Sequence, residues 1–174
     1  MLRLFVAVAL PPELKLSLSL LASGLPGAKW VDPGNYHLTL RFIGEIDEGQ
    51  AEDVDAALNH IRAHRFDVAL ATVGHFGLRQ LCVGVERSDA LQHLHAKIES
   101  ALSRLGFAPE DRRYTPHVTL ARLKGTSEAR LQAYLAQHAL YRAPPFRVER
   151  FSLIASYLTK SGAIYEAQAD YPLG

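Results

Sequence analysis

Two short segments with the same pattern stand out, because each carries a histidine and a threonine that suit phosphate chemistry. Segment 37–40 reads His-Leu-Thr-Leu, and segment 117–120, 80 positions later, reads His-Val-Thr-Leu. Side chains alternate between the faces of a strand, so the His and Thr of each segment share one face, about 7 Å apart along the chain. A single such segment is typical of a half-solvated strand with incidental polar residues. Its repetition favours a functional pair.

A pair of imidazoles facing one cleft suits the cleavage of a phosphodiester. A neutral ring takes a proton from the nucleophile, and a protonated ring gives one to the leaving oxygen. Because the reference pKa of histidine is about 6.5, both forms are accessible near neutral pH. Threonine hydroxyls can donate to the nonbridging phosphate oxygens. The predicted catalytic residues are therefore His37, Thr39, His117 and Thr119, with no metal and no cofactor.

The elements that must position these residues follow from the spacing of apolar residues and from helix caps. Leu14, Leu18, Leu21 and Leu25 fit a helical stripe, although the same segment also alternates like a strand; we favour the helix. Further helices are predicted to begin after Asp47, which has Gln50 in capping-box position, and after Ser88 and Ser127. Strands are predicted at 2–10, 36–43, 66–75, 81–86, 117–121, 146–157 and 163–170.

The two halves of the chain repeat the same order of elements. In each, a strand and a helix precede the histidine strand, and a capped helix follows it. The next strand begins at Phe66 in one half and at Phe146 in the other, 29 positions beyond its histidine in both. We therefore expect an α+β fold: two lobes of mostly antiparallel sheet related by a pseudo-twofold axis, with outer helices and a central cleft. It would form one bilobal domain, 1–174, built by internal duplication of approximately 1–80 and 81–174.

Composition limits the classes of partner. The 174 residues are 48% hydrophobic, with 19 Lys and Arg against 18 Asp and Glu, so any nucleic acid is expected to be gripped locally rather than along a long track. The single cysteine, Cys82, has no partner for a disulfide, which fits a reducing cytoplasm. The apolar segment 4–10 ends at two prolines, and no apolar segment is long enough for a bilayer. We expect a cytoplasmic protein with no membrane partner.

With these residues in view, the chain resembles a known family. The two His-x-Thr segments look like the paired signatures of the 2H phosphoesterase superfamily. More closely, the chain is similar to the bacterial and archaeal RNA 2′,3′-cyclic phosphodiesterases, also called 2′-5′ RNA ligases. The similarity runs nearly end to end and is carried by segments 3–7, 30–31, 42–45, 115–122 and 162–165.

The resemblance implies a substrate and a role for each motif residue. The substrate would be an RNA end with a 2′,3′-cyclic phosphate, such as a tRNA half or a short oligonucleotide, which water opens to a 2′-phosphate. His37 would be the general acid toward the 3′ oxygen, and His117 the general base that activates water. Thr39 and Thr119 would hold the phosphate. A monomer suffices, because one chain carries both half-sites.

The resemblance also implies two substrate-binding residues, Phe5 for base contact and Arg122 for the phosphate. Strand alternation places Arg122 on the face opposite His117, unless the strand contains a bulge or ends at Ala121. Arg41 is in phase with His37, so it is the alternative phosphate-facing cation, or else a solvated arginine.

Several alternatives remain open on the sequence alone. The same site could run in reverse and join a cyclic phosphate to a 5′-hydroxyl through a 2′-5′ linkage, or the protein could be a noncatalytic module that binds RNA ends. His60 and His64 have helical spacing for a metal but no third ligand nearby. Trp30 and Tyr36 could stack on a base or pack in the core.

Overall fold

Ten strands, four α-helices and one 3-10 turn make up the structure, a computed structural model that describes all 174 residues. The helices are α1 (Pro12–Ser19), α2 (Glu48–Asn59), α3 (Asp89–Arg104) and α4 (Glu128–Gln137), and the 3-10 turn is η1 (Pro33–Asn35). The strands are β1 (Leu2–Ala9), β2 (Ala28–Trp30), β3 (His37–Ile46), β4 (Phe66–Val68), β5 (Leu70–Phe76), β6 (Gln80–Val85), β7 (His117–Leu123), β8 (Phe146–Val148), β9 (Arg150–Thr159) and β10 (Gly162–Pro172).

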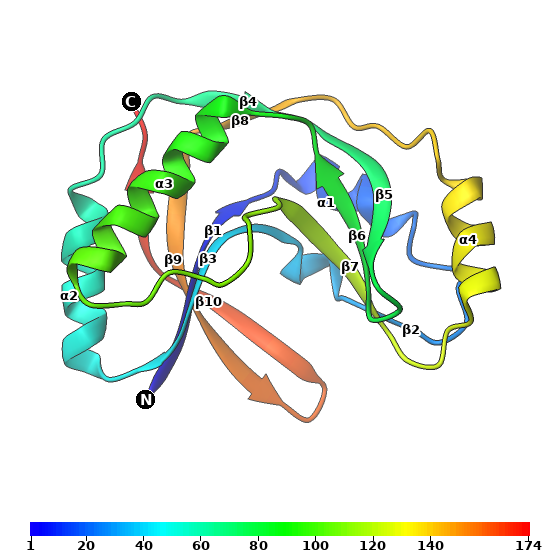
Figure 1. Cartoon of the computed structure of the whole chain (residues 1–174), viewed down its shortest axis with the longest axis horizontal. Helices are drawn as coiled ribbons and strands as arrows, with labels where there is room; N and C mark the ends of the chain where they lie inside the picture. The colour runs from blue at the N-terminus through cyan, green and yellow to red at the C-terminus, as the bar shows by residue number, and fades with distance from the viewer.

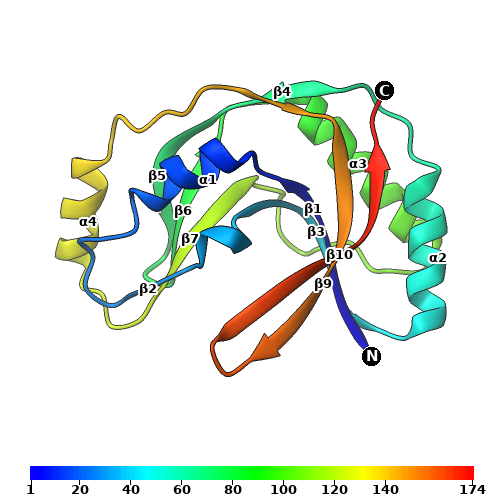
Figure 2. The ribbon, with the colours of Figure 1, turned by 180° about the vertical axis from the view of Figure 1, so that it is seen from behind.

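The strands form two four-stranded antiparallel sheets, which Figure 1 shows as the two sides of an arch. Lobe 1 has the strand order β10-β9-β1-β3 and is covered by α2 and α3; lobe 2 has the order β2-β7-β6-β5 and carries α1 and α4 (Figures 1 and 2). The strands that begin with the two histidines, β3 and β7, adjoin at the centre of the arch. The predicted α+β class, with antiparallel sheets and outer helices, is confirmed.

Each sheet contains strands from both halves of the chain. Strand β5 of the first half joins β6 and β7 in lobe 2, whereas β9 and β10 of the second half join β1 and β3 in lobe 1. The two connections meet in the antiparallel pair β4–β8, where Phe66 lies opposite Val148. The equivalent orders β1-α1-β3-α2-β4-β5 and β6-α3-β7-α4-β8-β9 support our proposal that the chain arose by duplication.

The predicted helix starts are confirmed by their caps. The Asp47 carboxylate accepts from the Gln50 amide at 2.7 Å, and the Gln50 side chain returns a contact to the Asp47 amide, which completes a capping box. The hydroxyls of Ser88 and Ser127 cap α3 and α4 in the same way. The predicted helical stripe extends from Leu14 to Leu25, but α1 ends at Ser19, so the helix is shorter than predicted.

Sequence patterns did not indicate the short strand β2, which η1 follows in the chain, or the division of the predicted strands 66–75 and 146–157 into β4 and β5 and into β8 and β9. Three residues are too few to show alternation, and β2 is held by its partner strand, with Ala28 opposite Leu123. The two aromatics near these elements pack inward. Tyr36 is 2% exposed, and the half-buried Trp30 lies 6.2 Å from the Tyr134 ring between centroids, so core packing is the correct alternative for Tyr36.

The core lies behind the histidine strands. Leu38, Leu40, Val118 and Leu120 are at most 1% exposed, on the faces opposite the motif histidines and threonines. The strands are therefore anchored by leucine and valine on one side and are free to present polar groups on the other. None of the four helices has the length and apolar character that crossing a membrane requires.

Gly27, just before β2, allows a close approach that any side chain would prevent. Its φ is +84°, and an added Cβ would lie 2.5 Å from Thr126 Oγ1 and 2.6 Å from the Lys124 carbonyl oxygen. Gly24 has a similar φ of +80° with no atom within 4 Å of an added Cβ. It therefore provides a matched control for the backbone strain alone.

We expect Gly24→Ala to lower the free energy of unfolding by about 1–2 kcal/mol, the cost of a left-handed backbone with a Cβ. Gly27→Ala should lower it clearly more, because the backbone of the β2–β7 edge must also move. Urea unfolding of both variants measures the difference. Equal losses would contradict the importance of this close contact.

Candidate active site

The rings of His37 and His117 are held by the same contact. In each, Nδ1 lies 2.7 Å from the carbonyl oxygen of the residue two positions before, Asn35 in one case and Thr115 in the other. A carbonyl only accepts, so Nδ1–H must donate, and Nε2 is left as the basic nitrogen of the neutral ring. Both rings therefore present the nitrogen that can exchange a proton with a substrate.

Aromatic side chains support both rings. The Phe5 and Tyr165 rings lie 4.8 and 5.1 Å from the His37 ring, and the Phe76 ring lies 4.7 Å from the His117 ring, all between centroids. These neighbours limit the rotation of each imidazole about its side-chain bonds. Both rings are thus fixed by one hydrogen bond and by aromatic packing.

Burial sets the protonation of His37. Removal from water lowers its pKa, and although the Asn35 carbonyl opposes this shift, the positive charges of Lys15 and His117 lower the pKa further. These effects stabilise the neutral form of the His37 ring relative to that of a solvated imidazole. A positive charge on His117 therefore adds to the cost of protonating His37.

A β-bulge in β7 brings Arg122 to the face of the histidine. The consecutive residues 81–82 of β6 pair with Ala121 and Thr119, so Leu120 has no partner. Leu120 and Ala121 are both buried, and Arg122 is exposed, because the bulge shifts the alternation by one residue. The structure thus meets the condition under which Arg122 can share the face of His117.

The same bulge occurs in β3 and changes the environment of Arg41. Residues 6–7 of β1 pair with Arg41 and Thr39, so Leu40 is the unpaired residue. Arg41 therefore turns toward the interior and is 5% exposed, while Phe42, 46% exposed, takes the outward position. The prediction of Arg41 as a phosphate-facing or solvated cation is wrong.

Arg41 instead connects β3 to α3 and to the loop that follows. Its Nη1 lies 2.8 Å from both carboxylate oxygens of Glu99, and its Nη2 donates to the Ala108 carbonyl at 2.6 Å. In the same loop, the Tyr114 hydroxyl donates to the Thr39 carbonyl at 2.9 Å. A buried charge needs such a partner, so this arginine is committed to structure.

A cavity of about 610 Å³ opens between the two histidine strands. It is lined by Thr39 from β3 and by His117 and Arg122 from β7. The remaining lining residues are Leu40, Phe42, Phe76, Arg79, Gln80, Glu110, Arg112, Arg113, Tyr114 and Thr115. The structure thus brings three of the predicted site residues into one pocket, whereas His37, Thr119 and Phe5 are not among its lining residues.

The charge of this cavity is positive. Four arginines line it, Arg79, Arg112, Arg113 and Arg122, and none of them forms an ion pair. The one carboxylate, Glu110, accepts from the Phe42 amide at 3.0 Å and lies 3.6 Å from Arg41 Nε. Four guanidinium groups without ion-pair partners in one cavity favour a polyanionic ligand.

Gln80 is a site residue that the sequence did not reveal. Its Nε2 donates to Thr119 Oγ1 and lies 3.4 Å from His117 Nε2, so it contacts both motif residues of lobe 2. In the sheets, Gln80 pairs with Arg122 as Phe5 pairs with Phe42. Gln80 thus occupies in β6 the position that Phe5 occupies in β1. The sequence could indicate this equivalence only if the strand register were already known.

Phe5 differs from its expected environment. Only 2% of the residue is exposed, because His37, Phe42 and Tyr165 surround the ring. A buried ring has no free face for a base, so the expected base contact does not fit this position. Phe5 packs against the His37 ring instead, and the exposed phenyl ring that lines the cavity is that of Phe42.

Comparison with known proteins identifies what the chain is similar to. The model of the LigT-like phosphoesterase family matches twice, over residues 8–82 and 83–165. The RNA 2′,3′-cyclic phosphodiesterase of Aeropyrum pernix is 35% identical over 154 residues, covering 85% of this chain and 87% of the relative. That of Thermotoga maritima is 31% identical, covering 94% and 91%. The crystal structure of E. coli LigT with 3′-AMP aligns over 99% of this chain and 98% of that one, with a TM-score of 0.83 and 26% identity.

Lys15 offers a test of the electrostatics around His37. Its ammonium group donates to the Gly34 carbonyl at 3.3 Å and contributes to the lowered pKa of His37. We expect Lys15→Gln to raise the pKa of His37, because the imidazolium form no longer faces that positive charge. An NMR titration of the ring protons measures the shift. Lys29→Gln, in β2, removes the same charge as a control, and an unchanged His37 pKa in Lys15→Gln would contradict this environment.

Proposed function

The chain belongs to the LigT-like phosphoesterase family, and from this premise we propose that it hydrolyses RNA 2′,3′-cyclic phosphate ends to 2′-phosphates by two-histidine acid–base catalysis, without a metal. Relatives named RNA 2′,3′-cyclic phosphodiesterase support the cyclic phosphodiesterase activity. One observation carries the proposal of mechanism: His37 and His117 are oriented by the same hydrogen bond, which makes Nε2 the basic nitrogen of the neutral ring in both.

In the proposed reaction, His117 Nε2 takes a proton from water as its oxygen attacks phosphorus. His37 Nε2 donates a proton to the 3′ oxygen as the P–O3′ bond breaks, which leaves a 2′-phosphate and a 3′-hydroxyl. The hydroxyls of Thr39 and Thr119 donate to the nonbridging oxygens, where negative charge increases. Proton exchange with solvent restores both rings. Each proton transfer contributes about 10²–10⁴ to the rate.

Substrate binding has a specific consequence for His37 in this scheme. A general acid must begin protonated, yet burial and nearby positive charges lower the pKa of His37 in the free protein. The cyclic phosphate carries a negative charge, which stabilises an adjacent imidazolium and raises its pKa. We infer that the phosphate itself helps to protonate the acid.

The positive cavity supports a nucleic-acid substrate rather than an isolated cyclic nucleotide. One cyclic phosphate carries one negative charge, whereas four unpaired arginines line the cavity. Additional phosphodiesters upstream of the RNA end would use these cations. Arg122 is the proposed phosphate-binding arginine, since the bulge in β7 brings it to the face of His117.

The histidine variants provide the direct test. An oligonucleotide with a 2′,3′-cyclic end, incubated in excess EDTA, should yield a 2′-phosphate and a 3′-hydroxyl, identified by mass spectrometry and phosphatase mapping. His37→Ala and His117→Ala should each lower kcat by about 10²–10⁴ while the affinity for the RNA end changes little. His93→Ala, an exposed histidine on α3, is the control.

Three outcomes would redirect the proposal. Binding without turnover in the wild-type protein would favour a noncatalytic RNA-end module, and a 2′-5′-linked product with a 5′-hydroxyl RNA would favour the reverse reaction. Inhibition by EDTA that divalent ions reverse would contradict the absence of a metal from the mechanism.

The pH dependence of the rates should carry the signature of His37. Both kcat/KM and kcat are expected to be bell-shaped, because one ring must be charged and the other neutral. The rate falls at high pH because His37, the proposed acid, loses its proton. This fall should occur at lower pH in kcat/KM, which reports the free protein, than in kcat, which reports the complex with an anionic substrate. A profile that rises to a plateau without falling would contradict the paired assignment.

A further inference from the structure

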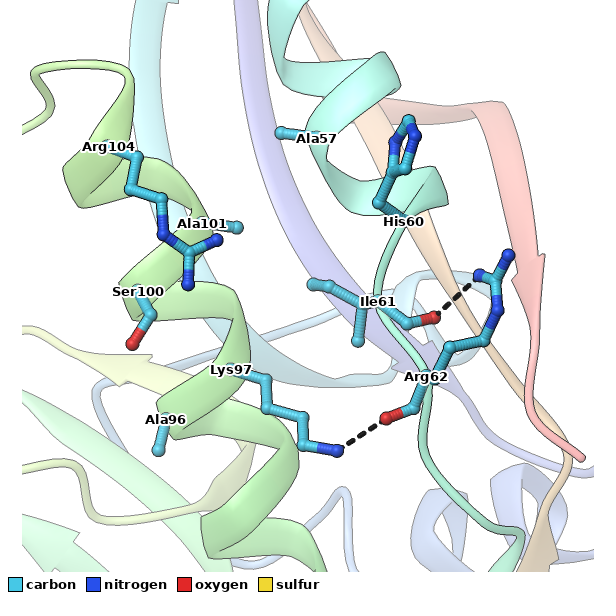
Figure 3. Close-up of a pocket in the computed structure, with 9 residues that line it drawn as sticks. All are labelled: Ala57, His60, Ile61, Arg62, Ala96, Lys97, Ser100, Ala101 and Arg104. Atoms are coloured by element: carbon cyan, nitrogen blue, oxygen red, sulfur yellow. Dashed lines mark hydrogen bonds between the residues drawn. The ribbon is translucent and has the colours of Figure 1, made fainter.

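A second positively charged cavity lies on lobe 1 and includes neither His37 nor His117 in its lining. It has a volume of about 410 Å³ and is formed where the end of α2 faces α3, as Figure 3 shows. His60, Arg62, Lys97 and Arg104 supply its polar lining together with Ser100. An adjoining cavity of about 400 Å³ shares Arg62 and Lys97 and adds His64. We call these two cavities together the α2–α3 groove.

The cations of the groove are not neutralised. No Asp or Glu side chain lines either cavity, and Arg62, Lys97 and Arg104 form no ion pair with any carboxylate, although the last residue, Gly174, lines the adjoining cavity. Arg62 donates to the carbonyls of Asn59 and Ile61 at 2.9 and 3.2 Å, and Lys97 donates to the Arg62 carbonyl. These contacts with neutral acceptors orient the side chains and leave their charge uncompensated. Since the whole chain has a net charge of only +1, the groove is a local concentration.

The α2–α3 groove is connected to the active-site cavity by a single loop. Helix α3 ends at Arg104 in the groove, and residues 105–116 then run to His117 (Figure 1). That loop contributes Arg112 and Arg113 to the active-site cavity. Unpaired cations therefore occur at both ends of one continuous segment, with Glu110, which pairs with Arg41, and Asp111 between them, so a polyanion that used both ends would span this acidic stretch.

We propose that the α2–α3 groove binds backbone phosphates of the same RNA whose cyclic end lies in the active site, several nucleotides upstream. This inference rests on the proposed function. Contacts of this kind carry no sequence information; they add affinity and orient the RNA. The groove would therefore favour long substrates over single nucleotides, while the chemistry stays at the histidines.

Substitutions in the groove should separate long from short substrates. The probes are a 2′,3′-cyclic mononucleotide and a single-stranded RNA of about 16 nucleotides, a length at the upper end of single-strand binding sites. We expect Lys97→Gln with Arg104→Gln to weaken RNA binding and to make the slope of log Kd against log salt less steep by about 1.4, the loss of two phosphate contacts. The KM for the mononucleotide should stay at the wild-type value.

One further groove variant keeps the test independent of lost side-chain contacts, and two variants outside the groove serve as controls. Ser100→Glu places a carboxylate in the groove and removes no hydrogen bond of the structure, and we expect a loss of RNA affinity of about fivefold or more. Gln92→Glu adds the same charge to α3 outside both cavities, and Lys124→Gln with Arg130→Gln removes two positive charges from lobe 2. These control variants should bind the RNA like the wild type.

The outcomes distinguish this inference from the proposed function. Unchanged RNA affinity and salt slope in the groove variants would overturn the groove proposal, as would an equal loss for RNA and mononucleotide. Groove-dependent RNA binding by a protein that cleaves no cyclic phosphate would leave the groove proposal standing and overturn the proposed function. Arg112→Gln, within the active-site cavity, should weaken the binding of both a dinucleotide with a 2′,3′-cyclic end and the long RNA. This variant shows the effect expected of a phosphate contact close to the cyclic end.

Discussion

In each histidine strand, an imidazole Nδ1–H donates to the carbonyl two residues before it, and this bond leaves Nε2 as the basic nitrogen of the neutral ring. The carbonyls belong to the segments that lead into β3 and β7, so the position of each Nε2 depends on how those segments are held. Asn35 is tied to β10, where its side-chain amide donates to the Ala163 carbonyl at 2.8 Å. The orientation of a ring in lobe 1 thus depends on a strand from the end of the chain.

The two bulges exchange the roles of neighbouring residues. Without them, period-two alternation would direct Arg41 to the cleft and Arg122 away from it; with them, the reverse holds. The cost of turning Arg41 inward is offset by the carboxylate of Glu99, and the same guanidinium fixes the loop at Ala108. One backbone irregularity therefore places a cation at the site and also anchors the loop that brings Arg112 and Arg113.

The sequence predicted what local rules determine. Alternation placed His37 and Thr39 on one face, and capping residues predicted where three helices begin. Features that depend on strand register or on distant packing could not be read in this way: the bulges at Leu40 and Leu120, the burial of Phe5, and the contact of Gln80 with His117. The exchange of β5 and β9 between the sheets was equally hidden, because an internal repeat does not say which copy each strand joins.

That exchange bears on how the protein is made. As the chain leaves the ribosome, β5 is synthesised before β6 and β7, the strands of its own sheet, and β1 must wait for β9 at the far end of the polypeptide. Neither half can complete a sheet alone, so the nascent chain holds unpaired strand edges until synthesis is almost finished. Long-range pairing of this kind slows folding. It also means that a chain truncated after α4 would keep every strand of lobe 2 but would lack β9 and β10, half of the lobe 1 sheet.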